Sequence, residues 1–281
     1  MSNVDIVPET LEQIQKDFQR RFQKDATVKR IYELIKQNAV DYEDANEFAI
    51  RLGEMLSESL RKYITVETLP EGRMWYNIAS RIMTPTLSTN HALISDVCYY
   101  AQKAVNDKSG ISLKVIQPAL NTNKIEGFID KLSNAEDFES VQWMLEEPVV
   151  NYSQSVVDDS IRDNMESHAK SGLSPKIVRK LGANETRTAM RGKTKTKYKI
   201  PCRWCESLAG VWNYLDMPDF VADNIFRRHE YCRCTVEYID AEKKQDVWTK
   251  RIYDLDREER IQYSQQSTNE SREDRINRLG N

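Results

Sequence analysis

Four of the five cysteines in this 281-residue chain lie close together near its C-terminal end. The pattern is Cys202-x2-Cys205, followed later by His229-x2-Cys232-x-Cys234. A Cys-x2-Cys turn places two thiolates on one metal ion, and a distant second pair of ligands completes a tetrahedron. We therefore predict a zinc knuckle over residues 202–234, with Cys202 and Cys205 as two of its four ligands. Spacing favours His229 with Cys232 as the other two, and Cys232 with Cys234 is the alternative.

This site needs no open coordination position, which favours a structural zinc over a catalytic one. Residues 200–240 are too few to build a large apolar core. Zinc binding in comparable small sites contributes about 10–16 kcal/mol, whereas ordering each residue costs roughly 1–2 kcal/mol. His229 could instead be a general base, but its position three residues before Cys232 favours metal ligation or support of a ligand.

Two other interpretations of the cysteines remain open. A redox-active Cys-x2-Cys pair is typical of a βαβ context, which the helical sequence upstream does not supply. Two disulfides would suit an oxidising medium, whereas an odd number of cysteines in a reducing cytoplasm favours metal binding.

A basic stretch precedes the first cysteine of the knuckle and contains no acidic residue. From Lys193 to Lys199 basic residues alternate with others, which predicts a strand or an extended arm. Such an arm could neutralise DNA phosphates with a steep salt dependence, and the alternative is an ordinary solvated loop. The candidate nucleic-acid-binding residues are Arg187, Arg191, Lys193, Lys195, Lys197 and Lys199.

Composition restricts the class of protein. The net charge of −3 excludes a chain that is polybasic overall. Only nine glycines and eight prolines occur, which argues against a large, loop-rich β fold. No apolar run is long enough for a membrane segment, and the first residues lack the pattern of an export signal. We expect no small-molecule substrate.

Helical periodicity dominates the chain upstream of the basic stretch. We predict a break between two helices at Thr84-Pro85, and a short helix with Pro175 in its first turn. His168 falls in a long polar helix, where we expect it to be exposed, and His91 is expected near a helix start. Predicted helices cover residues 8–23, 28–35, 41–64, 74–83, 90–105, 118–128, 136–146 and 151–171.

These patterns predict a mainly α protein with a small α+β zinc-knuckle module that contains short strands. Residues 1–115 form a helical N-terminal region and residues 116–186 a second helical region. The basic arm and the Cys/His module follow at 187–250, and a charged, flexible tail at 251–281. The apolar stripes of residues 8–64 are interpreted as core, with a partner-docking surface as the alternative.

Charged residues flank the predicted knuckle. Glu206 could act as a carboxylate base while Arg227, Arg228 and Arg233 hold a phosphate, as in a small ribonuclease. We favour a solvated surface role for these four residues. Three scattered histidines give no support to a hydrolytic triad.

Several segments resemble the phage minor head proteins, the head-morphogenesis family of phages such as SPP1 and Mu. Cys202–Gly210 and Arg227–Glu237 resemble the C-terminal signature of that family. Asn151–Asp159, His168–Arg179 and Val247–Lys250 are similar to members from tailed phages and prophages of Gram-positive bacteria. The resemblance covers residues 150–250, and the basic stretch looks like an insertion within it.

The resemblance implies a structural virion component and not an enzyme. Such proteins enter the procapsid in few copies, bind the portal, coat or scaffold proteins or DNA, and can leave with the genome. The implied location is the head interior, with the host cytoplasm during assembly. Some relatives carry a toxin or enzyme domain beyond the knuckle, and we expect none here. The alternatives are a small nuclease or toxin-like enzyme, and a DNA-binding protein that uses the basic arm.

Overall fold

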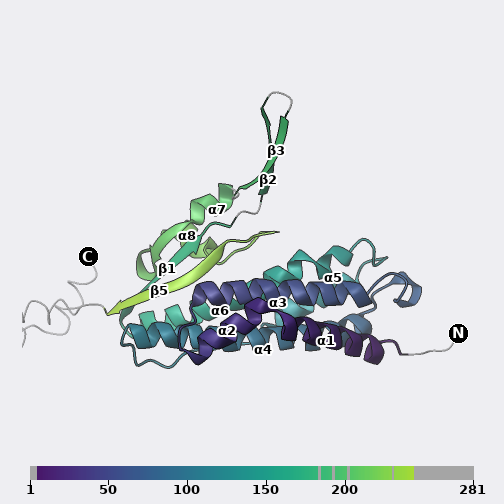
Figure 1. Cartoon of the computed structure of the whole chain (residues 1–281), viewed down its shortest axis with the longest axis horizontal. Coiled ribbons are helices and arrows are strands. Elements are labelled where there is room, and N and C mark those ends of the chain that lie inside the picture. The colour runs from purple at the N-terminus through teal and green to yellow at the C-terminus, as the bar shows by residue number, and fades with distance from the viewer. Residues whose placement is uncertain (1–4, 183–184, 192–193, 201–202, 230, 244–281) are drawn as a thin grey trace, which may run out of the picture.

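The computed structural model describes residues 5–182, 185–191, 194–200, 203–229 and 231–243 (Figure 1). Long helices pack side by side into a helical body, and a small sheet lies across one side of it. The helices are α1 (Val7–Lys24), α2 (Ala26–Lys36), α3 (Tyr42–Tyr63), α4 (Tyr76–Lys108), α5 (Thr122–Ser133) and α6 (Glu147–Lys170). Two short 3-10 turns, η1 (Pro70–Gly72) and η2 (Gln142–Leu145), lie between them.

Side-chain caps define where several helices begin. Asp41 and Asp44 form a capping box at the start of α3, in which each side chain accepts the other's backbone N–H. Asp25 caps α2 by accepting the Val28 N–H at 3.1 Å. After α6, Gly172 adopts a φ of 82°, the left-handed conformation expected of the residue that follows a helix.

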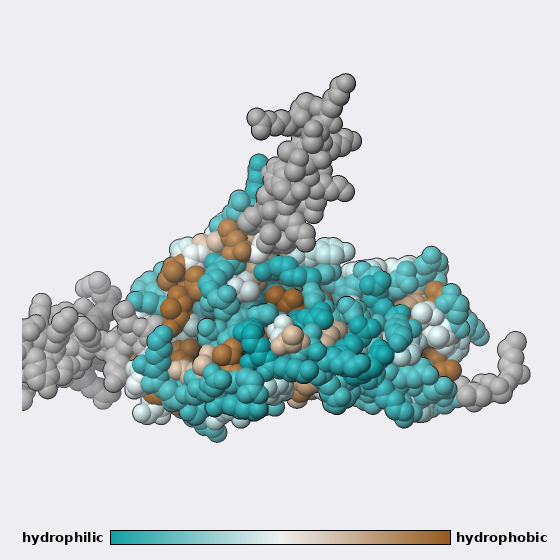
Figure 2. Space-filling model, in the orientation of Figure 1, coloured by the Kyte–Doolittle hydropathy of each residue, from teal (hydrophilic) through white to brown (hydrophobic). Residues whose placement is uncertain are grey.

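The apolar stripes of the first helices form the core of the body. Phe48 and Leu52 of α3 are buried, as are Ile14 of α1 and Ile31 of α2. The outward side of these helices in Figure 2 is mostly hydrophilic, with small scattered apolar areas. The interpretation of these stripes as core is therefore correct for these residues.

The predicted break at Thr84-Pro85 is wrong, because α4 runs continuously through Pro85. Proline in a helix interior costs about 3 kcal/mol through a lost hydrogen bond and a clash. Ile82, Met83 and Leu87 are fully buried on either side of it. Their packing outweighs the local cost, and His91 consequently lies within a helix instead of near a start.

The predicted short helix at Pro175 is also wrong, because Leu173–Lys180 forms strand β1. Its burial alternates, with Ile177 and Arg179 buried and their neighbours partly exposed, as a strand requires. Strand pairing on both sides of β1 overrides the helix-start signal of the proline. The region 116–186 is therefore not wholly helical, and the predicted helix at 136–146 contains only η2.

The main sheet is antiparallel with the strand order β4-β1-β5. Strand β4 comprises Gly210–Asn213 and β5 comprises Thr235–Lys243. Its register places Ile177 of β1 opposite Tyr238 of β5, next to a β-bulge. Asn46 of α3 donates to the Val236 carbonyl at 2.8 Å, which ties the buried face of β5 to the helical body. The short elements α7 (Arg203–Leu208), η3 (Tyr214–Asp216) and α8 (Asp219–Asn224) connect the strands.

The basic stretch forms a hairpin of β2 (Glu185–Arg191) and β3 (Thr194–Ile200), which confirms the predicted extended structure. Its register pairs Arg187 with Tyr198. Figure 1 shows the hairpin projecting away from the helices.

The described chain is mainly helical with a small antiparallel sheet, as predicted. Among the described residues, no helix combines the length and apolar character needed to cross a membrane.

A close crossing of α3 and α6 depends on Gly53. A Cβ atom at this position would lie 2.7 Å from the Cα of Val150 and 2.8 Å from the Oγ of Ser153. Gly127 in α5 offers a matched control, because a Cβ there would meet nothing within 4 Å.

We predict that Gly53→Ala lowers the free energy of unfolding by about 1–3 kcal/mol, because the two helix backbones must separate. Gly127→Ala should be neutral or stabilising by up to about 1 kcal/mol, since alanine favours helix. Urea denaturation of both variants and the wild type measures the difference. Equal effects of the two substitutions would show that the crossing is not tight.

Candidate metal centre

Three of the predicted zinc ligands come together in the structure. The Sγ of Cys205, a ring nitrogen of His229 and the Sγ of Cys232 all lie within 4.8 Å of one another. The Sγ of Cys205 is 3.1 Å from Nε2 of His229 and 3.9 Å from the Sγ of Cys232. Two sulfurs bound at about 2.3 Å to a tetrahedral ion would be about 3.8 Å apart. This group could therefore hold a metal ion.

Three different local structures supply these ligands. Cys205 lies in α7, His229 in the loop after α8, and Cys232 just before β5. Between the last two, Tyr231 adopts a left-handed backbone with a φ of 58°. This turn lets the Cys232 N–H donate to the His229 carbonyl at 3.2 Å. The ligands are thus brought together by a tight turn on one side and a short helix on the other.

The two remaining candidate ligands are Cys234, which the structure describes, and Cys202. Cys234 is buried but lies outside the group, and its Sγ accepts the Gly182 N–H at 3.3 Å. Gly182 is required there, because a Cβ atom would lie 2.1 Å from the carbonyl oxygen of Arg233. Cys202 falls outside the described residues. No disulfide joins any two of the described cysteines, which are Cys98, Cys205, Cys232 and Cys234.

Neighbouring groups favour a thiolate on Cys232. A hydrogen bond from Cys234 and the positive charges of Arg228 and Arg179 lower the pKa of Cys232, although burial opposes them. Its partner shows the opposite shift, because the hydrogen bond with Cys232 and burial raise the pKa of Cys234. Of the two thiols, the one that belongs to the metal-binding group, Cys232, therefore ionises more readily. By contrast, burial raises the pKa of the remote Cys98 to about 12.

A row of polar side chains on α6 binds the segment that contains His229 and Cys232. Positions 147, 151, 154 and 158 follow the i, i+4, i+7, i+11 spacing of one helix face. We call Glu147, Asn151, Gln154 and Asp158 the α6 polar row. Each of its members contacts the segment 228–234, which contains His229 and Cys232.

The strongest contact of the row is a buried ion pair. The two carboxylate oxygens of Asp158 accept Nε and Nη2 of Arg228 at 2.6 and 2.8 Å. The exposed fractions of these side chains are only 1% and 5%. Nη1 of Arg228 donates to the Cys234 carbonyl at 2.6 Å. Arg228 is therefore a structural link between α6 and the loop that carries the ligands.

The other members of the row add three more contacts. Both oxygens of Glu147 accept hydrogen bonds from Arg233 at 2.7 Å. Asn151 donates to the His229 carbonyl at 3.3 Å. With its amide oriented to satisfy both ends, Gln154 donates to the Cys232 carbonyl at 3.0 Å and accepts from Arg228. The row thus holds the backbone of two ligand residues directly.

These contacts correct two sequence predictions. Arg228 and Arg233 were expected to lie on a solvated surface, but both are paired with α6 carboxylates. His168 was expected to be exposed, but it is fully buried and its Nδ1 lies 2.6 Å from the Tyr238 hydroxyl. In both cases a polar side chain on α6 faces the sheet module, and its buried partner comes from a distant segment.

The charged residues of the ribonuclease alternative are either exposed or bound to other groups. Glu206 is exposed on α7. The guanidinium of Arg228 forms an ion pair with Asp158 and donates a hydrogen bond to the Cys234 carbonyl. Arg227 is exposed and donates to Asn224 at 3.2 Å.

Five of the six predicted nucleic-acid-binding residues lie in strands β2 and β3. Arg187 and Arg191 belong to β2, and Lys195, Lys197 and Lys199 belong to β3. The antiparallel register brings all five into one hairpin. Lys193 lies outside the described residues.

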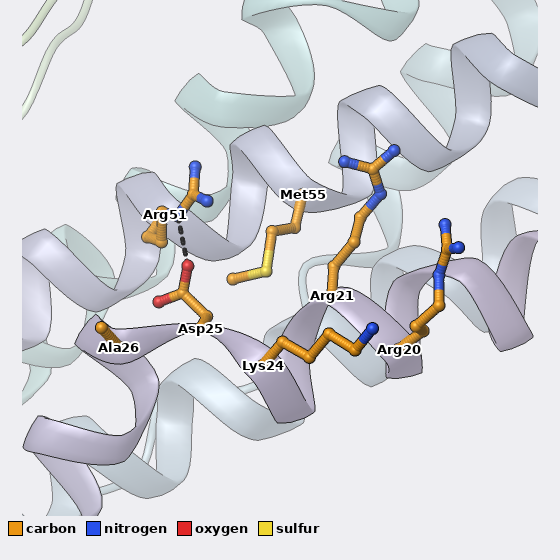
Figure 3. A pocket seen from close by; sticks show the side chains of 7 residues that line it. All are labelled: Arg20, Arg21, Lys24, Asp25, Ala26, Arg51 and Met55. Carbon is orange, nitrogen blue, oxygen red and sulfur yellow. Dashed lines mark hydrogen bonds and ion pairs between the residues drawn. The ribbon is translucent and has the colours of Figure 1, made fainter.

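A second cationic area lies on the helical body, around a pocket of about 410 Å³ between α1 and α3 (Figure 3). Carboxylates neutralise much of its charge. Arg51 pairs with Asp25 at 2.7 Å, and Arg21 and Arg20 both pair with the buried Asp17. This pocket therefore gives no strong anion-binding site.

Comparisons with known proteins give no relative for this chain. No protein-family model, no curated protein and no solved structure matches it.

The α6 polar row is the functional feature that sequence patterns alone did not reveal. The signal in the sequence is that Glu147, Asn151, Gln154 and Asp158 recur at the spacing of one helix face. The polar composition of this helix nevertheless predicts a solvent-exposed face. Only the tertiary structure shows that this polar face is covered.

We predict that Asp158→Asn lowers the free energy of unfolding by about 3–5 kcal/mol, because the buried Arg228 loses its counter-charge. Glu147→Gln, at the more exposed pair with Arg233, should cost only about 1 kcal/mol. Chemical denaturation monitored by tryptophan fluorescence compares the two variants. Similar small losses would mean that the Asp158–Arg228 pair does not hold the module on α6.

Proposed function

We propose that this chain is a phage minor head protein, a low-copy structural component of the virion with a zinc-stabilised Cys/His module. The observation that carries the proposal is the convergence of the segments that resemble this family. Asn151–Asp159 lies in α6, and its polar row contacts Arg227–Glu237 directly. The described residues of three of these segments are therefore in contact with one another, since Cys205 also contacts His229; Cys202 and Val247–Lys250 lie outside the described residues.

The donor set supports zinc as the metal. Thiolates and an imidazole suit a tetrahedral zinc ion, whereas hard cations such as Mg²⁺ and Ca²⁺ prefer oxygen ligands. The side chains of Cys205 and Cys232 are fully buried, which suits a closed site. Cys202, by its Cys-x2-Cys spacing, or Cys234 supplies the fourth ligand. When bound, the ion would cross-link α7, the His229 loop and the start of β5.

The way in which the module is attached supports a structural role. The polar groups next to the metal site hydrogen-bond to α6 and to backbone carbonyls, which suits a supporting role. A module of this kind supplies a rigid surface for assembly with the portal, coat or scaffold proteins. In this proposal the partners are phage proteins, and the location is the head interior.

Cysteine variants test the zinc centre. We expect about one zinc per wild-type chain, and loss of zinc together with a lower melting temperature in Cys205→Ser and Cys232→Ser. Cys98→Ser is the matched control, because Cys98 is also buried but lies in α4 away from the group. Elemental analysis and thermal unfolding measure both quantities. Zinc retained in the first two variants would refute these ligands.

Assembly tests the role in the virion. The full chain, produced with the portal and coat proteins of the same phage genome, should co-purify with procapsids in far fewer copies than the coat protein. Quantitative mass spectrometry of purified procapsids gives the copy ratio. Absence from procapsids and mature virions would contradict the proposal.

A nuclease assay tests the enzyme alternative. That alternative would be favoured if the wild type cleaves nucleic acid and if Glu206→Gln or His229→Gln protein remains folded but loses this activity.

DNA binding is a second candidate function, favoured by the β2–β3 hairpin that projects from the body (Figure 1). We expect the wild type to bind duplex DNA with an affinity that falls steeply with salt. Each lost phosphate contact lowers the slope of log affinity against log salt by about 0.9. Replacing Lys195, Lys197 and Lys199 with glutamine should reduce both affinity and slope. A fluorescence-anisotropy titration over a range of salt concentrations that shows no difference would exclude the hairpin.

A further inference from the structure

Arg179 of β1 is a buried cation that touches the metal-binding group. Its side chain has an exposed fraction of 1%. Nη2 lies 3.9 Å from the Sγ of Cys205 and 3.9 Å from the Sγ of Cys232. The guanidinium also lies over the ring of Trp204, 5.7 Å from its centroid.

The remaining contacts of Arg179 are with neutral groups. Nη1 donates to the Ile225 carbonyl, and Nη2 donates to the Arg227 carbonyl at 3.2 Å. Its Nε has no hydrogen-bond partner among the described residues. Within the described part of the chain, no carboxylate forms an ion pair with Arg179. The carboxylates of the α6 polar row pair with other arginines, Asp158 with Arg228 and Glu147 with Arg233.

An arginine side chain keeps its charge in a protein. A buried charge needs an opposite charge close by, because its lost hydration is otherwise uncompensated. The two sulfurs are the acidic groups that Arg179 contacts. The positive charge must therefore be balanced by the sulfurs and by whatever they bind.

We propose that Arg179 is the counter-charge of the metal–thiolate centre, and that the occupied centre carries a net charge of −1. This inference rests on the zinc centre proposed above. A divalent ion with two thiolates and two neutral ligands has no net charge and would leave Arg179 unbalanced. Three thiolates and one imidazole give the required single negative charge. Two of these thiolates are Cys205 and Cys232, and the imidazole is His229.

Arg179 is also placed to position the ligands. The Ile225 and Arg227 carbonyls that it holds belong to the segment leading into His229. One guanidinium therefore connects the central strand of the sheet, the His229 loop and both sulfurs. Outer groups of this kind orient metal ligands, and their loss typically weakens metal binding by about 10–100-fold.

Two variants and a control test the role of Arg179. Arg179→Met removes the charge while keeping an apolar chain, and Arg179→Lys keeps the charge on a different head group. Arg227→Met is the control, because this side chain is exposed and its backbone carbonyl remains. Zinc affinity is measured for each full-length variant by competition with a chromophoric chelator. We expect a loss of about 10–100-fold for Arg179→Met, a smaller loss for Arg179→Lys, and no change for Arg227→Met.

The cobalt spectrum of the wild type tests the ligand count without any variant. With Co²⁺ in place of zinc, the sulfur-to-cobalt charge-transfer intensity should correspond to three Co–S bonds in a tetrahedral site. An intensity for two Co–S bonds would overturn the inference even if Arg179→Met fails to fold. Wild-type affinity in a folded Arg179→Met variant would overturn it as well. A wild type that binds neither Zn²⁺ nor Co²⁺ would instead refute the metal centre itself.

Discussion

Arg228 reaches from the Cys/His module into the face of α6, where both oxygens of Asp158 accept its hydrogen bonds. The pair is almost fully buried, so separating it would leave two charges without water or partner. The same guanidinium holds the Cys234 carbonyl, which fixes the start of β5. The metal-binding group thus depends on a helix that contributes no metal ligand itself.

The helical body makes this arrangement possible by holding α6 rigidly. Gly53 lets α3 approach α6 so closely that backbone meets backbone. Along β5, Asn46 of α3 donates to the Val236 carbonyl, and the ring of Tyr42 stacks on that of Tyr238 at 6.4 Å. His168 binds the hydroxyl of the same tyrosine. The sheet is therefore attached to the body by polar contacts on α3 and α6, and the metal site lies at its end.

How much of this could be predicted depends on whether each feature is local. The Cys-x2-Cys and His-x2-Cys spacings are local, so the candidate ligands and the mainly helical class are readable from sequence. Pro85 and Pro175 misled the prediction because packing and strand pairing outweigh a local proline preference. The α6 polar row and the buried His168 were missed for a related reason. A polar helix face looks solvated until a distant segment with matching donors covers it.

The central claim is that the Cys/His module is held by a closed, structural zinc site. Zinc K-edge X-ray absorption of the purified full-length chain tests this most directly. The account predicts three sulfur ligands at about 2.3 Å and one nitrogen at about 2.0–2.1 Å, with no water ligand. A site without zinc, or a zinc that retains a water oxygen, would contradict it.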